Sequence, residues 1–216
     1  MIISRGRKYI FVHIPKTGGT SLAQALEDRA MRDDILIGDT PKALRRKKRL
    51  KLLSSRGRLW KHATLADIAG VVTPEALDDM FVFTLVRNPW DRLVSYYHWL
   101  RAQTFEHPTV TLSKSLTFGA FLHHQEVQKS FRANPAASYT RDVEGRQRCT
   151  QFIRLEHFDA DAVPLFAHLG FRFKLPHVNA SSRVQDFRRY YDDDTRAIVS
   201  DICAEDVDRF GYEFAS

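Results

Sequence analysis

The stretch from residue 9 to residue 21 limits the fold of this chain more than any other. Its first half, Tyr9–Ile14, is a run of apolar, β-branched and aromatic side chains, which predicts a short buried strand. Pro15 follows, and because proline has no backbone N–H to donate to a sheet, we expect the strand to end there.

The second half of the stretch has the features of an anion site. Gly18 and Gly19 allow the backbone to turn tightly and to approach a ligand closely. Thr20 and Ser21 precede an amphipathic run at residues 22–26, which predicts a helix with a hydroxyl cap. The first N–H groups of a helix lack partners within it, and the helix dipole makes that end positive. A loop of this kind therefore predicts a binding site for an anion.

The position of the lysine separates this loop from the common nucleotide-binding P-loop. That pattern has glycine, four residues and then Gly-Lys-Ser or Gly-Lys-Thr, whereas here Lys16 precedes both glycines. The order resembles the 5'-phosphosulfate loop of the sulfotransferases that use PAPS (3'-phosphoadenosine 5'-phosphosulfate), most closely the carbohydrate branch with its Golgi-type and bacterial members. The alternative is an ordinary strand-to-helix turn with a surface lysine.

A second strand-to-helix junction follows about 70 residues after the first loop. Phe81–Val86 predicts a buried strand, and Asn88 and Pro89 are typical of a helix N-cap and first helical position. The run Arg-Asn-Pro-Trp-Asp-Arg, followed by Ser-Tyr-Tyr, resembles the 3'-phosphate site of the same family. The resemblance implies that Arg87 and Ser95 hold this phosphate, and the planar guanidinium of arginine suits bidentate contact with it. A salt bridge that caps the helix is the alternative for Arg87.

Strand-then-helix spacing occurs a third time near the C-terminal end. Thr150–Leu155 predicts a buried strand, and Phe158–Leu169 predicts an amphipathic helix that Gly170 ends. Three such units predict an α/β fold with a parallel sheet. The resemblance implies the P-loop-like parallel sheet flanked by helices of the sulfotransferase fold. Because no repeat or low-complexity linker divides the chain, we expect a single sulfotransferase domain over residues 1–216.

The segments between these units give weaker signals. Asp33–Gly38 predicts a short strand, and Leu116–His124 predicts a helix with its aromatic residues on the core side. Residues 103–115 contain Pro108 and several threonines and predict a loop.

The family resemblance also implies a reaction, which is transfer of a sulfuryl group from PAPS to an acceptor hydroxyl, with a carbohydrate as the acceptor class. Lys16 would stabilise the leaving oxygen, and its charge together with the helix dipole would make a metal unnecessary. Asn179, Ser182 and Arg183 lie in a polar segment that resembles a late loop of the family. The residues implied to bind the donor are Lys16, Thr17, Gly18, Gly19, Thr20, Ser21, Arg87, Ser95, Asn179, Ser182 and Arg183.

His62 is the candidate general base. It lies between the two phosphate motifs, where the resemblance places a catalytic histidine, and an imidazole with a pKa near ~6.5 can accept a hydroxyl proton at neutral pH. Glu156, just beyond the third strand, is the alternative base. His13, at the end of the first strand, is expected to belong to the architecture of the loop.

Residues 42–58 form a basic segment with a thin apolar edge of leucines. Such a run is usually a solvated face, and its functional alternatives are an acidic acceptor beside the site and peripheral contact with anionic lipid through Arg45–Arg49. The net charge of +7 predicts attraction to anions. Aromatic residues do not alternate with the lysines and arginines of this segment, as they do in sites for single-stranded nucleic acid, so no nucleic-acid partner is expected.

The remaining features suggest a location. Cys149 and Cys203 fit a reducing compartment, residues 1–7 are polar, and the apolar run after them is too short for a signal peptide. No stretch approaches the ~20 apolar residues of a membrane span. We therefore expect a cytoplasmic protein.

Two other functions compete with sulfuryl transfer. A P-loop kinase would need the other lysine order and a magnesium-binding aspartate at a strand end. A non-catalytic polyanion-binding protein could use the same fold with the Arg45–Arg49 run, although the presence of Lys16 argues against it.

Overall fold

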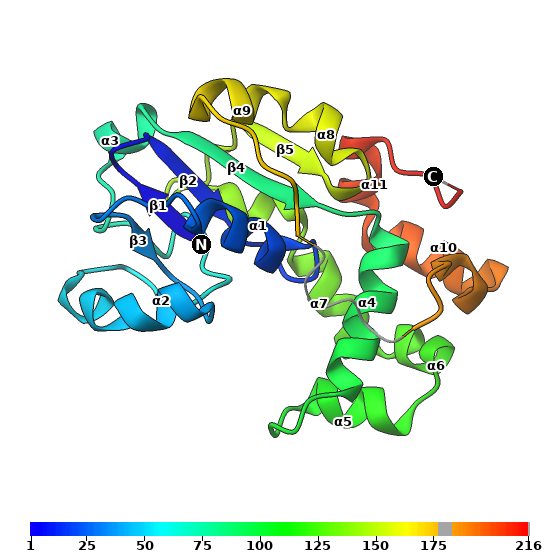
Figure 1. Ribbon diagram of the computed structural model, residues 1–216. Helices are drawn as coiled ribbons and strands as arrows, with labels where there is room; N and C mark the ends of the chain where they lie inside the picture. The colour runs from blue at the N-terminus through cyan, green and yellow to red at the C-terminus, as the bar shows by residue number, and fades with distance from the viewer. Residues whose placement is uncertain (177–182, 216) are drawn as a thin grey trace. The chain divides into compact units, whose positions relative to one another are not determined.

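The structure is a computed structural model that describes residues 1–176 and 183–215. It contains a five-stranded sheet with strand order β3-β1-β2-β4-β5 (Figure 1). The three strands predicted before helices are confirmed as β2, β4 and β5, although β5 lies at an edge of the sheet and is only partly buried, and the short strand predicted within Asp33–Gly38 is confirmed as β3. The strands are β1 (Ile2–Ser4), β2 (Tyr9–Val12), β3 (Ile35–Leu36), β4 (Phe81–Val86) and β5 (Gln151–Arg154).

The sheet is mixed, so the expectation of a wholly parallel sheet is corrected at one edge. β2, β4 and β5 pair in parallel as predicted. β1, however, pairs antiparallel with both β2 and β3, with Ile3 opposite Ile10 on one side and Ile35 on the other. The reason is local: β1 is joined to β2 by the turn Arg5–Lys8, which is too short for the crossover that a parallel pair requires.

The chain divides into two compact units. Unit 1 comprises Met1–Val86 and Ala136–Val178, and it contains the whole sheet. Its helices are α1 (Gly19–Glu27), α2 (Pro41–Arg46), α3 (Pro74–Asp78), α8 (Phe158–Asp161) and α9 (Val163–Leu169), with the 3₁₀ helices η1 (Lys47–Leu52), η2 (Ala136–Thr140) and η3 (Leu155–His157).

Strand β2 is buried on both faces of the sheet. Tyr9 and Phe11 pack into a core with residues of α1, α8 and α9, whereas Ile10 and Val12 pack into a second core formed with the segment 63–72. This division follows from the alternation of side chains along a strand. The loop after β2 therefore starts from a strand that is packed on both faces.

Unit 2 comprises Arg87–Pro135 and Asn179–Ser216 and is helical. Its elements are α4 (Pro89–Arg101), α5 (Pro108–Ser115), α6 (Phe118–His123), α7 (Gln125–Ala133), η4 (Phe187–Tyr190), α10 (Asp193–Ile202) and α11 (Ala204–Phe210). The structure confirms the helices predicted after Asn88 and within Leu116–His124.

No helix of the described residues is long and apolar enough to cross a membrane.

Two predictions about helices are wrong. Residues 103–115 are not a loop throughout, because α5 occupies their second half. Pro108, taken as a breaker, stands in the first turn of α5, where its missing N–H costs no bond, and the His107 side chain caps this helix by accepting from Thr109 N. The single helix predicted over 158–169 is two helices, which meet at Ala162 just before Pro164.

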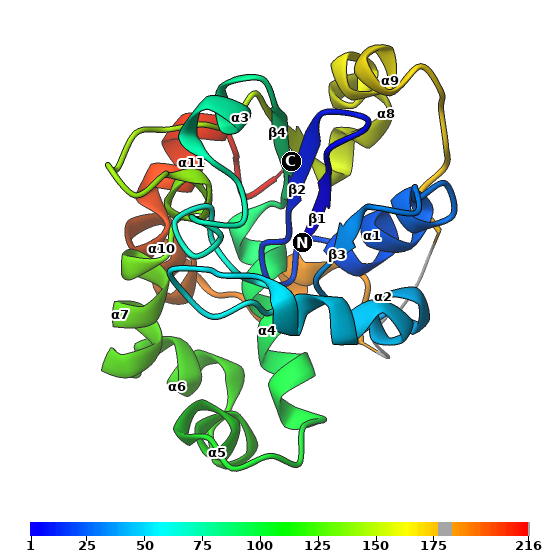
Figure 2. The ribbon, with the colours of Figure 1, turned by 90° about the vertical axis from the view of Figure 1, so that its left-hand side faces the viewer.

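The basic segment 42–58 folds as α2, then η1, then irregular chain. Thr40 caps α2 by accepting from Ala43 N at 3.2 Å, and α2 contacts the edge strand β3 (Figure 2). Arg46 donates to the carbonyl oxygens of Met31 and Asp34, which fixes the segment to the body of unit 1.

Candidate functional site

The loop between β2 and α1 is held in one conformation by its neighbours. The Thr84 hydroxyl donates to the Val12 carbonyl at 2.7 Å, which ties the end of β2 to β4. Thr17 is buried and donates its hydroxyl to the Ile14 carbonyl at 3.0 Å. Lys16 adopts φ 66°, a left-handed conformation that is uncommon for a residue with a side chain. Strained backbone of this kind often occurs at functional sites.

Helix α1 begins earlier than predicted, and its cap is a glycine. Gly18 is the N-cap residue with φ 84°, no described side chain caps the helix, and the Gly18 carbonyl accepts from the N–H groups of Ser21 and Leu22 at 3.1 and 3.3 Å. The expectation of a hydroxyl cap is therefore wrong: Thr20 and Ser21 lie inside the first turn of α1. The N–H groups of Gly19 and Thr20 belong to the turn that has no carbonyl partner within a helix.

Both glycines of the loop are required by close neighbours. A Cβ atom added at Gly18 would lie 2.9 Å from Leu155 Cδ1, and one added at Gly19 would lie 2.1 Å from His13 Cδ2. The His13 ring therefore lies directly against the start of α1. This places His13 within the architecture of the loop, as the sequence predicts.

His62 is attached to the same strand end. Its Nδ1 lies 2.8 Å from the His13 carbonyl oxygen, and the two rings are 4.7 Å apart in an edge-on arrangement. Because a carbonyl oxygen only accepts, Nδ1 carries the proton and the lone pair of the neutral imidazole is on Nε2. The ring of Trp60 packs edge-on against His62 at 5.1 Å.

Burial determines the charge of both histidines. It lowers the pKa of His62 to about 4, against the effect of the His13 carbonyl, and Lys61 lowers it further. Burial also holds the pKa of His13 well below its usual value. Both imidazoles are neutral at pH 7, which is the form that a base requires.

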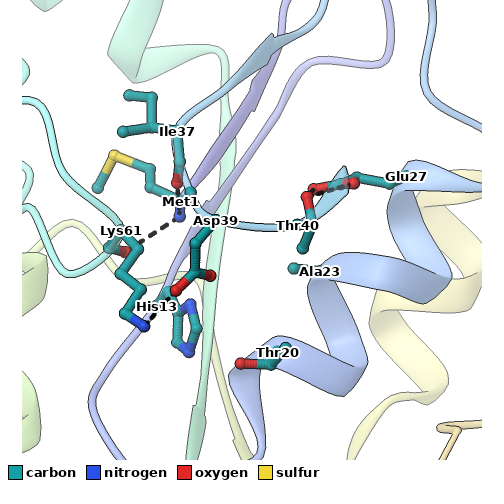
Figure 3. A pocket seen from close by; sticks show the side chains of 10 residues that line it. Met1, His13, Thr20, Ala23, Glu27, Ile37, Asp39, Thr40 and Lys61 are labelled. Atoms are coloured by element: carbon teal, nitrogen blue, oxygen red, sulfur yellow. Dashed lines mark hydrogen bonds and ion pairs between the residues drawn. The ribbon is translucent and has the colours of Figure 1, made fainter. Parts of the chain in front are cut away.

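A polar pocket opens between α1 and the segment that follows β3. Figure 3 shows the Thr20 side chain at its rim, the His13 ring beside it, and Lys61 bonded to Asp39 at 2.6 Å. The Thr40 hydroxyl donates to Glu27 at 2.7 Å, and burial raises the pKa of this carboxyl. The residues that line the pocket are Met1, His13, Thr20, Ala23, Glu27, Ile37, Gly38, Asp39, Thr40 and Lys61.

Unit 2 holds the second predicted motif at the N-terminus of α4. Asn88 caps the helix by accepting from Trp90 N at 3.1 Å, as expected. Arg87 donates from Nε to Asp91 Oδ2 at 2.8 Å, so the salt bridge considered for this arginine exists. Ser95 is buried two turns into α4.

Arg183 reaches the same carboxylate from a distant part of the sequence. Its Nη2 donates to Asp91 Oδ1 at 2.5 Å, so Asp91 bridges two arginines that are 96 positions apart. Sequence reasoning missed this role of Asp91, although its spacing of four residues from Arg87 is the spacing of a helical ion pair. The predicted contacts Asn179 and Ser182 lie outside the described residues.

Glu156, the alternative base, lies in η3 directly after β5 and is exposed. His62, in contrast, is in contact with the strand that leads into the loop. The structure thus brings His62, His13 and the loop together within unit 1.

Comparisons with known proteins were made for the whole chain. A family model described as the sulfotransferase family matches residues 1–213. Among solved structures, the chain is similar to mouse sulfotransferase SULT7A1 complexed with PAP, with 16% identity, a TM-score of 0.48, and coverage of 95% of this chain and 85% of that one. No curated protein matches the sequence.

Proposed function

This chain belongs to the sulfotransferase family, and we propose that it transfers a sulfuryl group from PAPS to a hydroxyl group of a carbohydrate acceptor. The observation that carries the proposal is the loop after β2, in which Lys16, two sterically required glycines and the N-terminus of α1 follow one another. Backbone N–H groups and a lysine at such a position suit a phosphosulfate.

The residues of the loop fit a donor of this kind. Leu155 and His13 require glycine at positions 18 and 19, so no side chain at these positions shields the backbone N–H groups from an anion. In the proposal, residues 17–21 hold the 5'-phosphate through backbone N–H groups and through the hydroxyls of Thr20 and Ser21, whereas the Thr17 hydroxyl donates to the Ile14 carbonyl. Lys16 stabilises the negative charge that develops on the phosphate oxygen as its bond to sulfur breaks, and no metal is assigned a role.

The acceptor proton is assigned to His62. As the acceptor oxygen forms its bond to sulfur, its proton passes to Nε2, because Nδ1 already carries a proton and donates it to the His13 carbonyl. The hydrogen bond also orients the ring, as the partners of catalytic histidines commonly do. Glu156 remains the alternative base.

The 3'-phosphate is assigned to Arg87 and Ser95, to which we add Arg183; Asn179 and Ser182 stay candidate contacts with the donor. Support comes from the two guanidinium groups gathered on one carboxylate, which leave a net positive charge at the start of α4. This assignment would make the donor PAPS rather than a nucleotide without a 3'-phosphate.

Two measurements test the proposed function. Transfer of labelled sulfate from PAPS to a panel of carbohydrates should be detectable, and adenosine 3',5'-bisphosphate should raise the unfolding temperature more than ATP does. A larger shift with ATP would favour the kinase. Nucleotide binding without any sulfate transfer, combined with tight binding to a polyanion, would favour the non-catalytic alternative.

The basic segment is the proposed place of peripheral contact with anionic lipid. Arg45, Lys47, Lys48 and Lys51 are exposed, and Leu44 and Leu52 expose 52% and 87% of their surface among them. Residues 41–62 contain ten of the 33 Lys and Arg residues and no Asp or Glu. The rest of the chain therefore has 23 Lys and Arg residues and 26 Asp and Glu residues. The positive charge of the protein thus originates in this segment.

A further inference from the structure

One face of α4 carries a stripe of polar side chains. Asp91, Ser95 and His98 are separated by four and three positions, a spacing that places them on the same side of a helix. The stripe begins one turn after Arg87, which is already bonded to Asp91. Only Arg87 and Ser95 are explained by the family motif.

Arg183 lies against this stripe. Its side chain is 9% exposed, and its Nη2 is fixed on Asp91 Oδ1. The guanidinium is also close enough to His98 to lower the pKa of that imidazole, an effect to which burial contributes most and Arg101 contributes as well. Tyr190 links the two sides geometrically, because its ring packs against His98 and its hydroxyl accepts from the N–H of Val184, the residue after Arg183. Asp91, Arg183 and His98 are therefore one cluster.

Two nitrogen atoms of this cluster are buried and have no hydrogen-bond partner among the described residues: Arg183 Nη1 and His98 Nε2. A buried donor without a partner is costly, and in native proteins it usually has a water, an ion or a ligand to bind. Asp91 accepts from Arg87 and from Nη2 of Arg183, but it bonds neither of these two nitrogen atoms. Arg183 Nη1 can only donate, so its missing partner is an acceptor, and beside two guanidinium groups that acceptor is most favourably an anion. His98 Nε2 can donate to the same acceptor in the tautomer that carries the proton on Nε2.

The ring of His98 is held in place by aromatic contacts. It packs edge-on against Tyr97 at 5.4 Å and against Tyr190 at 5.2 Å. Because the ring is fixed on both sides, it holds Nε2 in one direction, and in the tautomer with the proton on Nε2 this atom is a preorganised donor.

We propose that His98 is a specificity-determining residue that donates a hydrogen bond from Nε2 to the 3'-phosphate of the donor, beside Arg183 Nη1. Asp91 is the positioning residue that aims Arg183 at the same group. This inference rests on the proposed function, since it takes the phosphate at this end of α4 to be that of PAPS. It adds to the motif a ligand that the sequence pattern does not contain.

The test measures the preference for the 3'-phosphate. Dissociation constants of adenosine 3',5'-bisphosphate and 5'-AMP are measured by calorimetry for the wild-type chain, His98→Phe and His98→Gln. The phenylalanine keeps the aromatic packing without a donor, and the glutamine keeps a donor. We expect His98→Phe to reduce the preference for the bisphosphate by about 10-fold to 100-fold, the range of one hydrogen bond to a charged group, with 5'-AMP affinity unchanged. His98→Gln should restore most of the preference.

A control and a second variant complete the experiment. His123→Phe changes an exposed histidine of the same unit and should change neither constant. If His98→Phe does not fold, His98→Leu serves for the same measurement, and Arg183→Gln should show the same selective loss. The inference would be overturned if a folded variant without a hydrogen-bond donor at position 98 kept the wild-type preference for the bisphosphate. It would also be overturned if the affinities for both nucleotides fell equally, because that result indicates a structural role. A wild-type chain without any preference would instead contradict the proposed donor.

Discussion

His62 donates its Nδ1 proton to the carbonyl oxygen of His13, 49 positions earlier in the chain, at 2.8 Å. One short contact thus joins the candidate base to the residue whose ring lies against Gly19 in the loop between β2 and α1. The contact also decides which nitrogen can accept a proton, because Nε2 is then the unprotonated atom.

The first prediction concerns the pH dependence of transfer. Since burial lowers the pKa of His62 to about 4, the base is already neutral far below pH 7, and kcat/KM should rise with pH through about 4 and stay level above it. This differs from the value near ~6.5 expected for an unperturbed imidazole. His62→Gln should lower kcat by ~10²–10⁴-fold while the bisphosphate still binds.

Glu156→Gln is the matched control for this experiment. If it abolishes transfer in a folded protein while His62→Gln remains active, the proton goes to the carboxylate and the assignment of His62 is wrong. If both variants are inactive and still bind the nucleotide, the variant that removes the acidic limb of the profile identifies the base.

The same shift predicts how stability depends on pH. The pKa of His62 is lower in the folded protein than in the unfolded chain, so the unfolded state binds more protons between about 4 and ~6.5. The stability is therefore fully present above ~6.5 and decreases as the pH falls to about 4. Urea unfolding at pH 7 and pH 5 should show this loss, and His62→Gln should reduce it; an unchanged difference would mean that other groups, such as buried His13, cause it.

The second prediction concerns the lysine of the loop. Lys16→Ala should lower kcat by ~10²–10³-fold and change the affinity for the bisphosphate much less, because its charge matters most as the leaving oxygen becomes negative. Lys8→Ala is a matched control, since Lys8 is the other described residue with a side chain and a positive φ, 53°. Near-normal kcat in Lys16→Ala would show that this lysine is a structural or surface residue.

The third prediction concerns the motif at α4. At a concentration ~100 times its dissociation constant, adenosine 3',5'-bisphosphate should stabilise the protein by ~2.7 kcal/mol, and 5'-AMP at the same concentration by much less. Arg87→Ala and Ser95→Ala should each reduce this difference in thermal unfolding. Arg132→Ala, which removes an exposed arginine paired with Asp201, is the control. Equal stabilisation of the wild type by both nucleotides would contradict the assignment of Arg87 and Ser95.

The sequence predicts those parts of the fold that depend on local signals. β2 and β4 are buried runs soon followed by Pro15 and Asn88, and β5 is a partly buried run of the same kind; these signals are sufficient because the residues that create each element lie within it or next to it. The prediction of a hydroxyl cap for α1 is wrong because Gly18, Thr20 and Ser21 are all possible N-cap residues in the sequence. Gly18 is the N-cap in the structure, where it packs closely against Leu155, a residue far away in the sequence. Likewise, nothing local shows that Asp91 binds Arg183 or that His62 binds the His13 carbonyl.

The fourth prediction concerns the basic segment. Replacing Arg45 and Lys48 together by glutamate should abolish sedimentation with vesicles that contain anionic lipid, since each Lys or Arg near such a surface contributes ~1 kcal/mol to the binding free energy. The unfolding temperature should stay unchanged because both side chains are exposed. The pair Arg188 and Arg189, changed in the same way, is the control. Binding that heparin removes but that does not occur on vesicles would indicate a polyanion partner instead.

The last prediction separates helix propensity from packing at the start of α1. In a helix, glycine to alanine usually stabilises by up to ~1 kcal/mol, and Gly119→Ala in the first turn of α6 should follow this rule, because the new Cβ would lie 3.6 Å from Thr195. Gly19→Ala should do the opposite and destabilise by ~1–3 kcal/mol, because its Cβ would overlap the His13 ring.

The kinetic effect of Gly19→Ala should be wider than a loss of donor binding. Movement of the His13 ring also disturbs the carbonyl that orients His62, so kcat should fall even at saturating donor, and Gly119→Ala should retain normal kcat. Urea unfolding and steady-state kinetics of the two variants provide the comparison. If Gly19→Ala is as stable and as active as Gly119→Ala, His13 can move at no cost, and the coupling between the loop and the base does not exist.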